Sequence, residues 1–350
     1  MSAKTGISWT DSTWNPVTGC SKVSAGCKHC YAEREWPRFY GRTEVTVPLP
    51  HGPIVVNGVR LTERVTKRPF THVVCHGDRL EYPIRWQRPR RIFVNSMSDL
   101  FHEDVPRDFI DQVFAVMALA SQHVFQVLTK RPERMLQYTE YTEAADMGNI
   151  VQHMNRITGN QEAPPWPLPN VWLGVSVENQ AAADARVPLL VQMPAAVHFV
   201  SAEPLLGPID LRRWLIARCA CGQAAPCNRH VDQPRSRVDW IIAGGESGPQ
   251  ARPMHPHWVR MIRDQCVSAG VAFFFKQWGA WVYGSVVPNN EYDGGACVET
   301  AHHGTHAITS ARLLDDCDGQ TTVAAVRVAT NHAGDVLDGR VWHDYPPVST

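Results

Sequence analysis

Three cysteines near the start of the chain are spaced like the ligands of a metal centre. Cys20, Cys27 and Cys30 form a C-x6-C-x2-C pattern, and Gly19 and Gly26 directly precede the first two. Small residues beside thiols let backbone amides approach the sulfur atoms of a metal centre. The pattern fits an iron–sulfur cluster with one iron left open, or a zinc site completed by a fourth ligand from elsewhere. The third interpretation is that these are ordinary buried thiols.

A second group of candidate metal ligands lies further along the chain. Glycine and proline separate its members, as in a zinc knuckle, and the group consists of Cys219, Cys221, Cys227 and His230. It falls between two predicted strands, so we expect an inserted loop stapled by zinc. The alternative is a set of unliganded thiols in a variable insert. A metal there would be structural or would contact a substrate.

Polar residues recur where short apolar runs end. The runs cover residues 91–95, 123–128, 171–175, 197–200, 239–244 and 271–275. The residues that follow them are the candidate site residues Ser96, Ser98, Asp99, Lys130, Ser176, Glu178, Ser201, Glu203, Gly244, Gly245, Glu246, Lys276 and Trp278. The carboxyl ends of parallel strands share one face of a βα barrel, and active sites lie on that face. The cysteine loop follows a short predicted strand in residues 1–19, so we expect it on the same face.

The elements that must position these residues follow from the apolar pattern. Each apolar run is four to six residues long without clean alternation, as in parallel strands buried on both faces. Helical spacing follows most runs, for example over residues 104–120, 180–192 and from 256 onward. Another helix is predicted from residue 31, ending at Pro37 and Gly41. Repeated βα units predict an α/β fold, a full or partial (β/α) barrel.

The barrel is predicted to form one domain over residues 1–279. We expect an irregular insertion or hairpin layer at residues 42–90 and the Cys-rich insert at 212–237. Residues 280–350 lose the βα rhythm, and we expect an irregular C-terminal extension that packs on the barrel.

Bulk composition limits the classes of function. The 350 residues carry 34 Lys+Arg and 34 Asp+Glu, so the net charge of zero counts against a strongly basic nucleic-acid clamp and leaves a local basic groove open. There is no apolar run long enough for a membrane span and no segment of signal-peptide type, so we expect a cytoplasmic protein. Ten cysteines in a reducing compartment are then metal ligands or thiols rather than disulfides.

Several motifs together resemble those of radical S-adenosylmethionine (SAM) enzymes. More closely, the chain resembles the phage- and prophage-borne three-Cys-motif family, which is largely uncharacterised. The matching segments are residues 7–20, 27–32, 93–102, 128–132, 174–178, 201–205, 244–248 and 275–279. They cover nearly all of the predicted barrel.

The resemblance implies an enzyme with a radical SAM type of barrel. Cys20, Cys27 and Cys30 would hold a [4Fe–4S] cluster whose open iron binds SAM, and SAM cleavage would give a radical that abstracts hydrogen from the substrate. The first gap of six residues departs from the commonest spacing of three. SAM would contact the candidate cofactor-binding residues Ser96, Ser98, Asp99, Ser176, Glu178, Ser201, Glu203, Gly244 and Gly245. Helix capping and structural salt bridges are the alternative roles for the serines and carboxylates among them.

Glu246, Lys130, Lys276 and Trp278 are expected on the substrate side. The phage context, reached through the resemblance, makes a nucleic acid or nucleotide the first candidate substrate, and a reducing electron donor a required partner. The rival hypothesis is a non-catalytic accessory protein, binding zinc or a cluster, that holds a nucleic acid or a partner protein.

Overall fold

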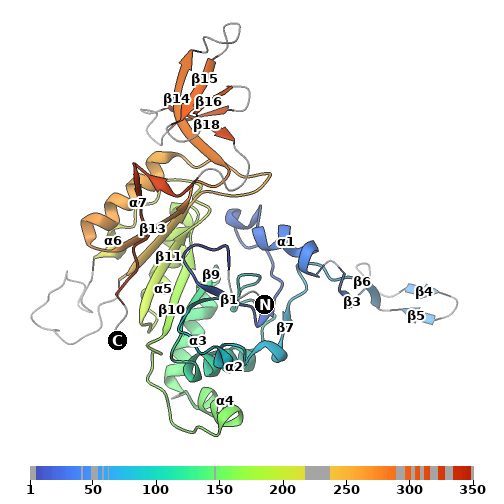
Figure 1. Ribbon diagram of the computed structural model, residues 1–350. Helices are drawn as coiled ribbons and strands as arrows, with labels where there is room; N and C mark the ends of the chain where they lie inside the picture. The colour runs from blue at the N-terminus through green and yellow to red at the C-terminus, as the bar shows by residue number, and fades with distance from the viewer. Residues whose placement is uncertain are drawn as a thin grey trace, which may run out of the picture.

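The computed structural model of this chain describes residues 5–40, 42–48, 54–56, 59–61, 63–145, 147–216, 237–288, 296–300, 304–307, 311–315, 322–327 and 334–347 (Figure 1). The Cys-rich insert, with Cys219, Cys221, Cys227 and His230, lies outside the described residues. None of the described helices is long and apolar enough to cross a membrane.

A seven-stranded parallel sheet, curled into a half-barrel, forms the centre of the molecule (Figure 1). Its strands pair in chain order: β1 (Ser12–Trp14), β8 (Arg91–Val94), β9 (Val124–Thr129), β10 (Val171–Ser176), β11 (Val197–Ala202), β12 (Trp240–Gly244) and β13 (Ala272–Gln277). The partial (β/α) barrel predicted from the apolar runs is therefore confirmed. All these strands run in one direction, so their carboxyl ends meet at one edge, as predicted.

Helices follow most of the strands. They are α1 (Tyr31–Tyr40), α2 (Arg107–Leu119), α3 (Pro132–Ala144), α4 (Gly148–Thr158), α5 (Gln180–Leu190), α6 (Arg212–Leu215) and α7 (Pro256–Ala269). Of the two residues predicted to end α1, Pro37 lies inside the helix, so that part of the prediction is wrong, whereas the helix does end at Tyr40, directly before Gly41. Trp36, directly before the proline, is buried and packs with Tyr40 and Phe70. Because Tyr40 lies one helical turn after Trp36, this packing favours continuation of the helix across Pro37.

Alternate residues of the strands face opposite sides of the sheet. One set, which includes Val94, Val127 and Val175, belongs to the large core formed with the helices. The other set makes a separate cluster with Trp9 and consists mainly of aromatic residues: Phe93, Trp172, Phe199, Trp240 and Phe274. Gly174 allows this packing, since a Cβ atom there would lie 2.5 Å from the Phe199 ring. The aromatic cluster fills the inside of the half-barrel.

The C-terminal segment packs against this cluster and the edge strand β13. The backbone of Phe274 bridges to His343 in antiparallel fashion, and their rings stack at 4.3 Å. Tyr345 packs its ring on Trp240 and Phe274, while Arg91 of β8 stacks on the same ring at 3.9 Å. The segment therefore links β13, at one edge of the sheet, to β8, the neighbour of the other edge strand β1.

The insertion after α1 contains strands in antiparallel pairs. β3 (Glu44–Pro48) pairs with β6 (Glu63–Lys67), and β4 (Ile54–Val56) pairs with β5 (Val59–Leu61) further out along the same arm (Figure 1). β2 (Val17–Thr18) pairs with β7 (Val74–Cys75). Short 3-10 helices lie at Ala25–Cys27, Gly77–Arg79 and Pro83–Arg85. A hairpin layer was one of the two forms expected for residues 42–90.

The expectation of an irregular segment over 280–350 is wrong for its described part. Five strands form an antiparallel sheet: β14 (Trp281–Pro288), β15 (Ala296–Thr300), β16 (Gly304–Ala307), β17 (Ala311–Asp315) and β18 (Thr322–Arg327). β19 (Val336–Leu337) and β20 (Arg340–Val341) add a small hairpin. Glycine and polar residues interrupt these strands in the sequence, so periodicity alone does not reveal them.

Candidate functional site

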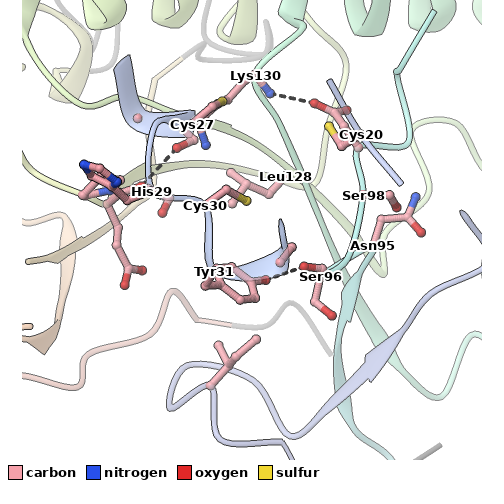
Figure 2. Close-up of a pocket in the computed structure, with 18 of the residues that line it drawn as sticks. Cys20, Cys27, His29, Cys30, Tyr31, Asn95, Ser96, Ser98, Leu128 and Lys130 are labelled. Atoms are coloured by element: carbon pink, nitrogen blue, oxygen red, sulfur yellow. Dashed lines mark hydrogen bonds between the residues drawn. The ribbon is translucent and has the colours of Figure 1, made fainter. Parts of the chain in front are cut away.

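A pocket of about 360 Å³ lies at the carboxyl ends of the parallel strands. All three cysteines of the N-terminal motif line it (Figure 2). The structure brings most of the other predicted site residues to the same pocket: Ser96, Ser98, Asp99, Lys130, Ser176, Ser201, Glu203, Gly245, Glu246 and Lys276. Glu178, Gly244 and Trp278 do not line it, although each lies beside residues that do.

Two glycines fix the path of the cysteine loop. Gly19 has a left-handed φ of +95°, and a Cβ atom there would lie 2.5 Å from the carbonyl oxygen of His72. The next residue, Cys20, donates its backbone N–H to the carbonyl of Phe70 at 2.9 Å. A Cβ atom on Gly26 would lie 3.3 Å from the Glu178 carboxylate. The sequence predicts that small residues here let backbone amides approach a metal centre, and that remains a prediction. The neighbours that the structure places against the two glycines are the backbone of His72 and the carboxylate of Glu178.

Glu178 anchors the cysteine loop from β10. Its Oε1 accepts the backbone N–H of Gly26 at 3.2 Å, and its Oε2 pairs with Arg186 at 3.0 Å. Burial by itself would raise the pKa of Glu178, but hydrogen bonds from Ser24 and Gly26 and the charges of Arg186 and Lys130 hold that pKa below its ordinary value. The carboxylate therefore stays ionised and holds the loop at neutral pH.

Asp99 joins the ends of β8 and β9. Its carboxylate accepts the hydroxyl of Thr129 at 2.7 Å and the backbone N–H of Lys130 at 3.1 Å, and it pairs with Arg131 at 3.3 Å. It also accepts the N–H of Phe101. α2 begins at Arg107, so Asp99 does not cap this helix, which was the alternative role considered for it.

Ser96 and Ser98 are held by the N-terminal strand region. Ser98 donates its hydroxyl to the carbonyl of Val17 at 2.8 Å, and Ser96 exchanges hydrogen bonds with the Asn15 amide at 3.2 Å. Tyr31 donates its hydroxyl to the Ser96 carbonyl (Figure 2). These contacts connect the segment after β8 to both sides of the cysteine loop.

Two further carboxylates of the pocket are paired with cations. Glu203 accepts from Lys276 Nζ at 2.6 Å, across the end of β12. The pair lies beside Gly244, where a Cβ atom would make ordinary contacts at 3.4 Å to Lys276 and 3.6 Å to Glu203. Glu246 accepts two hydrogen bonds from the Arg252 guanidinium, which also donates to the Ala25 carbonyl of the cysteine loop at 3.0 Å.

Lys130 differs from these residues. It lines the pocket beside Gly26, and among the described residues it has no ion-pair partner within 4.0 Å. An ammonium group in this position can bind a carboxylate or phosphate oxygen of a ligand.

Arg131 is a residue whose contacts the sequence does not reveal. Its guanidinium donates to the Cys20 sulfur at 3.7 Å and to the Ser21 hydroxyl at 2.7 Å, and it pairs with Asp99 and Glu103. The signal in the sequence is its place directly after Lys130 at a strand end, which is compatible with a structural salt bridge to a neighbouring carboxylate. Burial and Asp99 raise the pKa of the Cys20 thiol to about 11, and Arg131 partly offsets this.

Ser21 and His102 lie side by side but do not form a nucleophile and base. His102 Nε2 is 2.8 Å from Ser21 Oγ, and its Nδ1 accepts the backbone N–H of Asp104 at 3.1 Å. Burial lowers the pKa of His102, so the ring is neutral and carries its proton on Nε2. The histidine thus donates to the serine oxygen, whereas a nucleophilic serine must donate to the base.

In the part of the chain that the structure describes, no group of three or more His, Cys, Asp or Glu side chains is arranged to hold a single metal ion. The sequence model of a protein family described as "Protein of unknown function (DUF5131)" matches residues 4–346. No curated protein and no solved structure matches the chain.

Proposed function

The chain belongs to the DUF5131 family, and we propose that it is a radical SAM enzyme in which Cys20, Cys27 and Cys30 hold a [4Fe–4S] cluster. One observation carries the proposal. The three thiols line the same pocket as the polar residues at the strand ends of a parallel half-barrel. Three thiolates in a glycine-bracketed loop suit such a cluster and leave one iron for a ligand.

When bound, the cluster would supply the electron that cleaves SAM to a radical able to abstract hydrogen from a substrate. The pocket residues would bind and orient SAM. Lys130, which has no ion-pair partner within 4.0 Å among the described residues, offers its ammonium to a carboxylate oxygen of SAM or a phosphate oxygen of the substrate. Ser176 and Ser201 lie side by side at the ends of the neighbouring strands β10 and β11 and offer hydroxyls to the ribose or ammonium groups. We assign Gly245 to packing rather than to SAM, since a Cβ atom there would overlap the carbonyl oxygen of Trp278.

The ion pairs divide the remaining candidates into two groups. The carboxylates of Asp99, Glu178 and Glu246 each form an ion pair with an arginine of the protein. We therefore assign these residues to positioning the cysteine loop rather than to contacting SAM or substrate. Glu203 and Lys276 pair with each other, yet both line the pocket. The Lys276 ammonium has three N–H donors and uses one on Glu203 Oε1, which leaves donors for a ligand.

We retain a nucleotide or nucleic acid as the first candidate substrate and a reducing protein as the electron donor. The rival proposal is a non-catalytic protein that uses the cysteines to hold zinc or an inert cluster and binds a nucleic acid or partner protein. Both proposals place metal at the same three cysteines and differ in whether SAM is cleaved.

Anaerobic reconstitution with iron and sulfide tests the proposal. We expect about four irons and four sulfides per chain and, after reduction, formation of 5′-deoxyadenosine from SAM. Cys27→Ala should lose the cluster, whereas Cys75→Ser, the matched control outside the motif, should keep it. A colourless protein that holds only zinc after reconstitution would overturn the proposal. A cluster that binds without SAM cleavage would favour the non-catalytic rival.

A further inference from the structure

We infer that Arg131 is a positioning residue that donates a charge-assisted hydrogen bond to the cluster ligand Cys20 and thereby raises the reduction potential of the cluster. This inference rests on the proposed function. Arg131 lies outside the three-cysteine motif, and its hydrogen bond makes the surroundings of Cys20 differ from those of Cys27 and Cys30.

The guanidinium of Arg131 reaches the cysteine loop at three atoms. Its Nη1 lies 3.7 Å from Cys20 Sγ, within the range of a hydrogen bond to sulfur. Its Nη2 donates to both the hydroxyl and the carbonyl of Ser21, at 2.7 and 3.3 Å. The side chain is only 11% exposed, so water screens its charge weakly.

Acidic partners hold the guanidinium in this orientation. Asp99 pairs with Nη1 at 3.3 Å, and Glu103 pairs with Nε at 3.1 Å. The backbone N–H of Arg131 is also fixed, by the Thr129 hydroxyl at 2.9 Å. A planar fork held on several sides keeps one N–H directed at the sulfur, which a lysine ammonium could not reproduce.

The three thiols therefore differ. Among the described residues, Arg131 is the side chain that donates a hydrogen bond to a cysteine sulfur, and the sulfur that accepts it belongs to Cys20. Hydrogen bonds to cluster sulfurs and nearby positive charge tune the potential of iron–sulfur centres. Reduction adds one negative charge to the cluster, and a cation beside the ligand stabilises that charge. Removing the cation must therefore make the midpoint potential more negative.

The test compares reconstituted wild type, Arg131→Lys and Arg131→Gln by potentiometric titration followed by electron paramagnetic resonance. We expect the midpoint to become more negative in the order wild type, R131K, R131Q. Arg134→Gln is the matched control, because Arg134 lies in the first turn of α3, which begins directly after Arg131, and donates to the Val105 carbonyl instead of the cysteine loop. Its midpoint should equal that of wild type.

The outcomes separate the two proposals. If wild type takes up no cluster, the proposed function fails and this inference fails with it. If wild type and R131Q both hold the cluster with the same midpoint, the inference alone is overturned. A purely structural role for Arg131 would lower thermal stability and leave the midpoint of the loaded fraction unchanged, and R131K, which retains the charge, guards against a variant that does not fold.

Discussion

Gly19 shows how one residue determines the position of a ligand. The sequence indicated that the backbone must bend beside Cys20, but it could not identify what the glycine approaches. The structure identifies the carbonyl of His72, in a segment more than fifty residues away that returns to pair with β2. Residue types at the site could therefore be predicted, whereas their long-range partners could not.

Replacing Gly19 by alanine should damage both stability and cluster uptake. The added Cβ atom would clash with backbone, which cannot move aside easily, and φ of +95° is costly for any residue with a side chain. We expect a loss of about 2 kcal/mol or more in the free energy of unfolding, measured by urea denaturation. Gly77→Ala is the control, since no atom lies within 4 Å of a Cβ there. Equal stability of both variants would contradict the role of Gly19.

His76 should make the region around the cysteine loop sensitive to acid. Its Nε2 lies 2.7 Å from the Thr18 hydroxyl, which also accepts from Arg68. Burial, together with the charges of Arg79 and Arg68, lowers the pKa of His76 to about 4. The folded state thus binds fewer protons than the unfolded state between about pH 4 and 6.5. The stabilisation is complete above pH 6.5 and is lost as the pH falls toward 4.

Urea denaturation of wild type and His76→Gln at several pH values measures this effect. The free energy of unfolding should fall more steeply with acid in wild type, by at most about 1.4 kcal/mol per pH unit for one proton and less because the ring is partly solvated. His102 and His123 also have lowered pKa values, so only the difference between the two proteins isolates His76. Parallel pH profiles would refute the assignment.

The separate elements of the barrel could be predicted better than the additions to it. Strands β8 to β13 are uniformly apolar because both faces are covered, and this makes them visible in the sequence. The five-stranded sheet after β13 was not predicted, because polar residues and glycines separate its strands in the sequence and hide the apolar pattern. The sequence predicts that the C-terminal segment packs on the barrel, but it does not identify β13 as the strand that the segment pairs with.

The contact of Tyr345 with the sheet should contribute to global stability. Its ring packs on Trp240 and Phe274, and the Arg91 guanidinium stacks on the same ring at 3.9 Å from the ring centre. Tyr345→Ala should lower the free energy of unfolding by about 1–3 kcal/mol, less than for a fully buried aromatic residue. Tyr345→Phe keeps the ring and should remain near wild type. If Y345A unfolds at the wild-type urea concentration, the segment does not brace the half-barrel.

Charge across the whole molecule limits how it can meet a nucleic acid. The net charge is zero, and most cations that line the pocket are already paired with carboxylates. Lys22 pairs with Glu33, Arg131 with Asp99, and Lys276 with Glu203. Each phosphate that a protein neutralises releases counterions and steepens the dependence of affinity on salt. Among the described residues that line the pocket, Lys130 is the lysine or arginine without a carboxylate partner within 4.0 Å, so the pocket can neutralise few phosphates.

We therefore expect a shallow salt dependence if the substrate is a nucleic acid. Fluorescence anisotropy with a labelled single-stranded oligonucleotide between 50 and 200 mM salt should give a slope of log affinity against log salt of about −0.7 to −1.4, the values for one and two phosphate contacts to a single strand. Lys130→Gln should reduce this slope by about 0.7, the value for one contact to a single strand. Lys28→Gln, an exposed charge in the cysteine loop, provides the comparison at the surface. A slope of −5 or steeper would show an extended basic footprint and would move the nucleic-acid contacts away from the pocket.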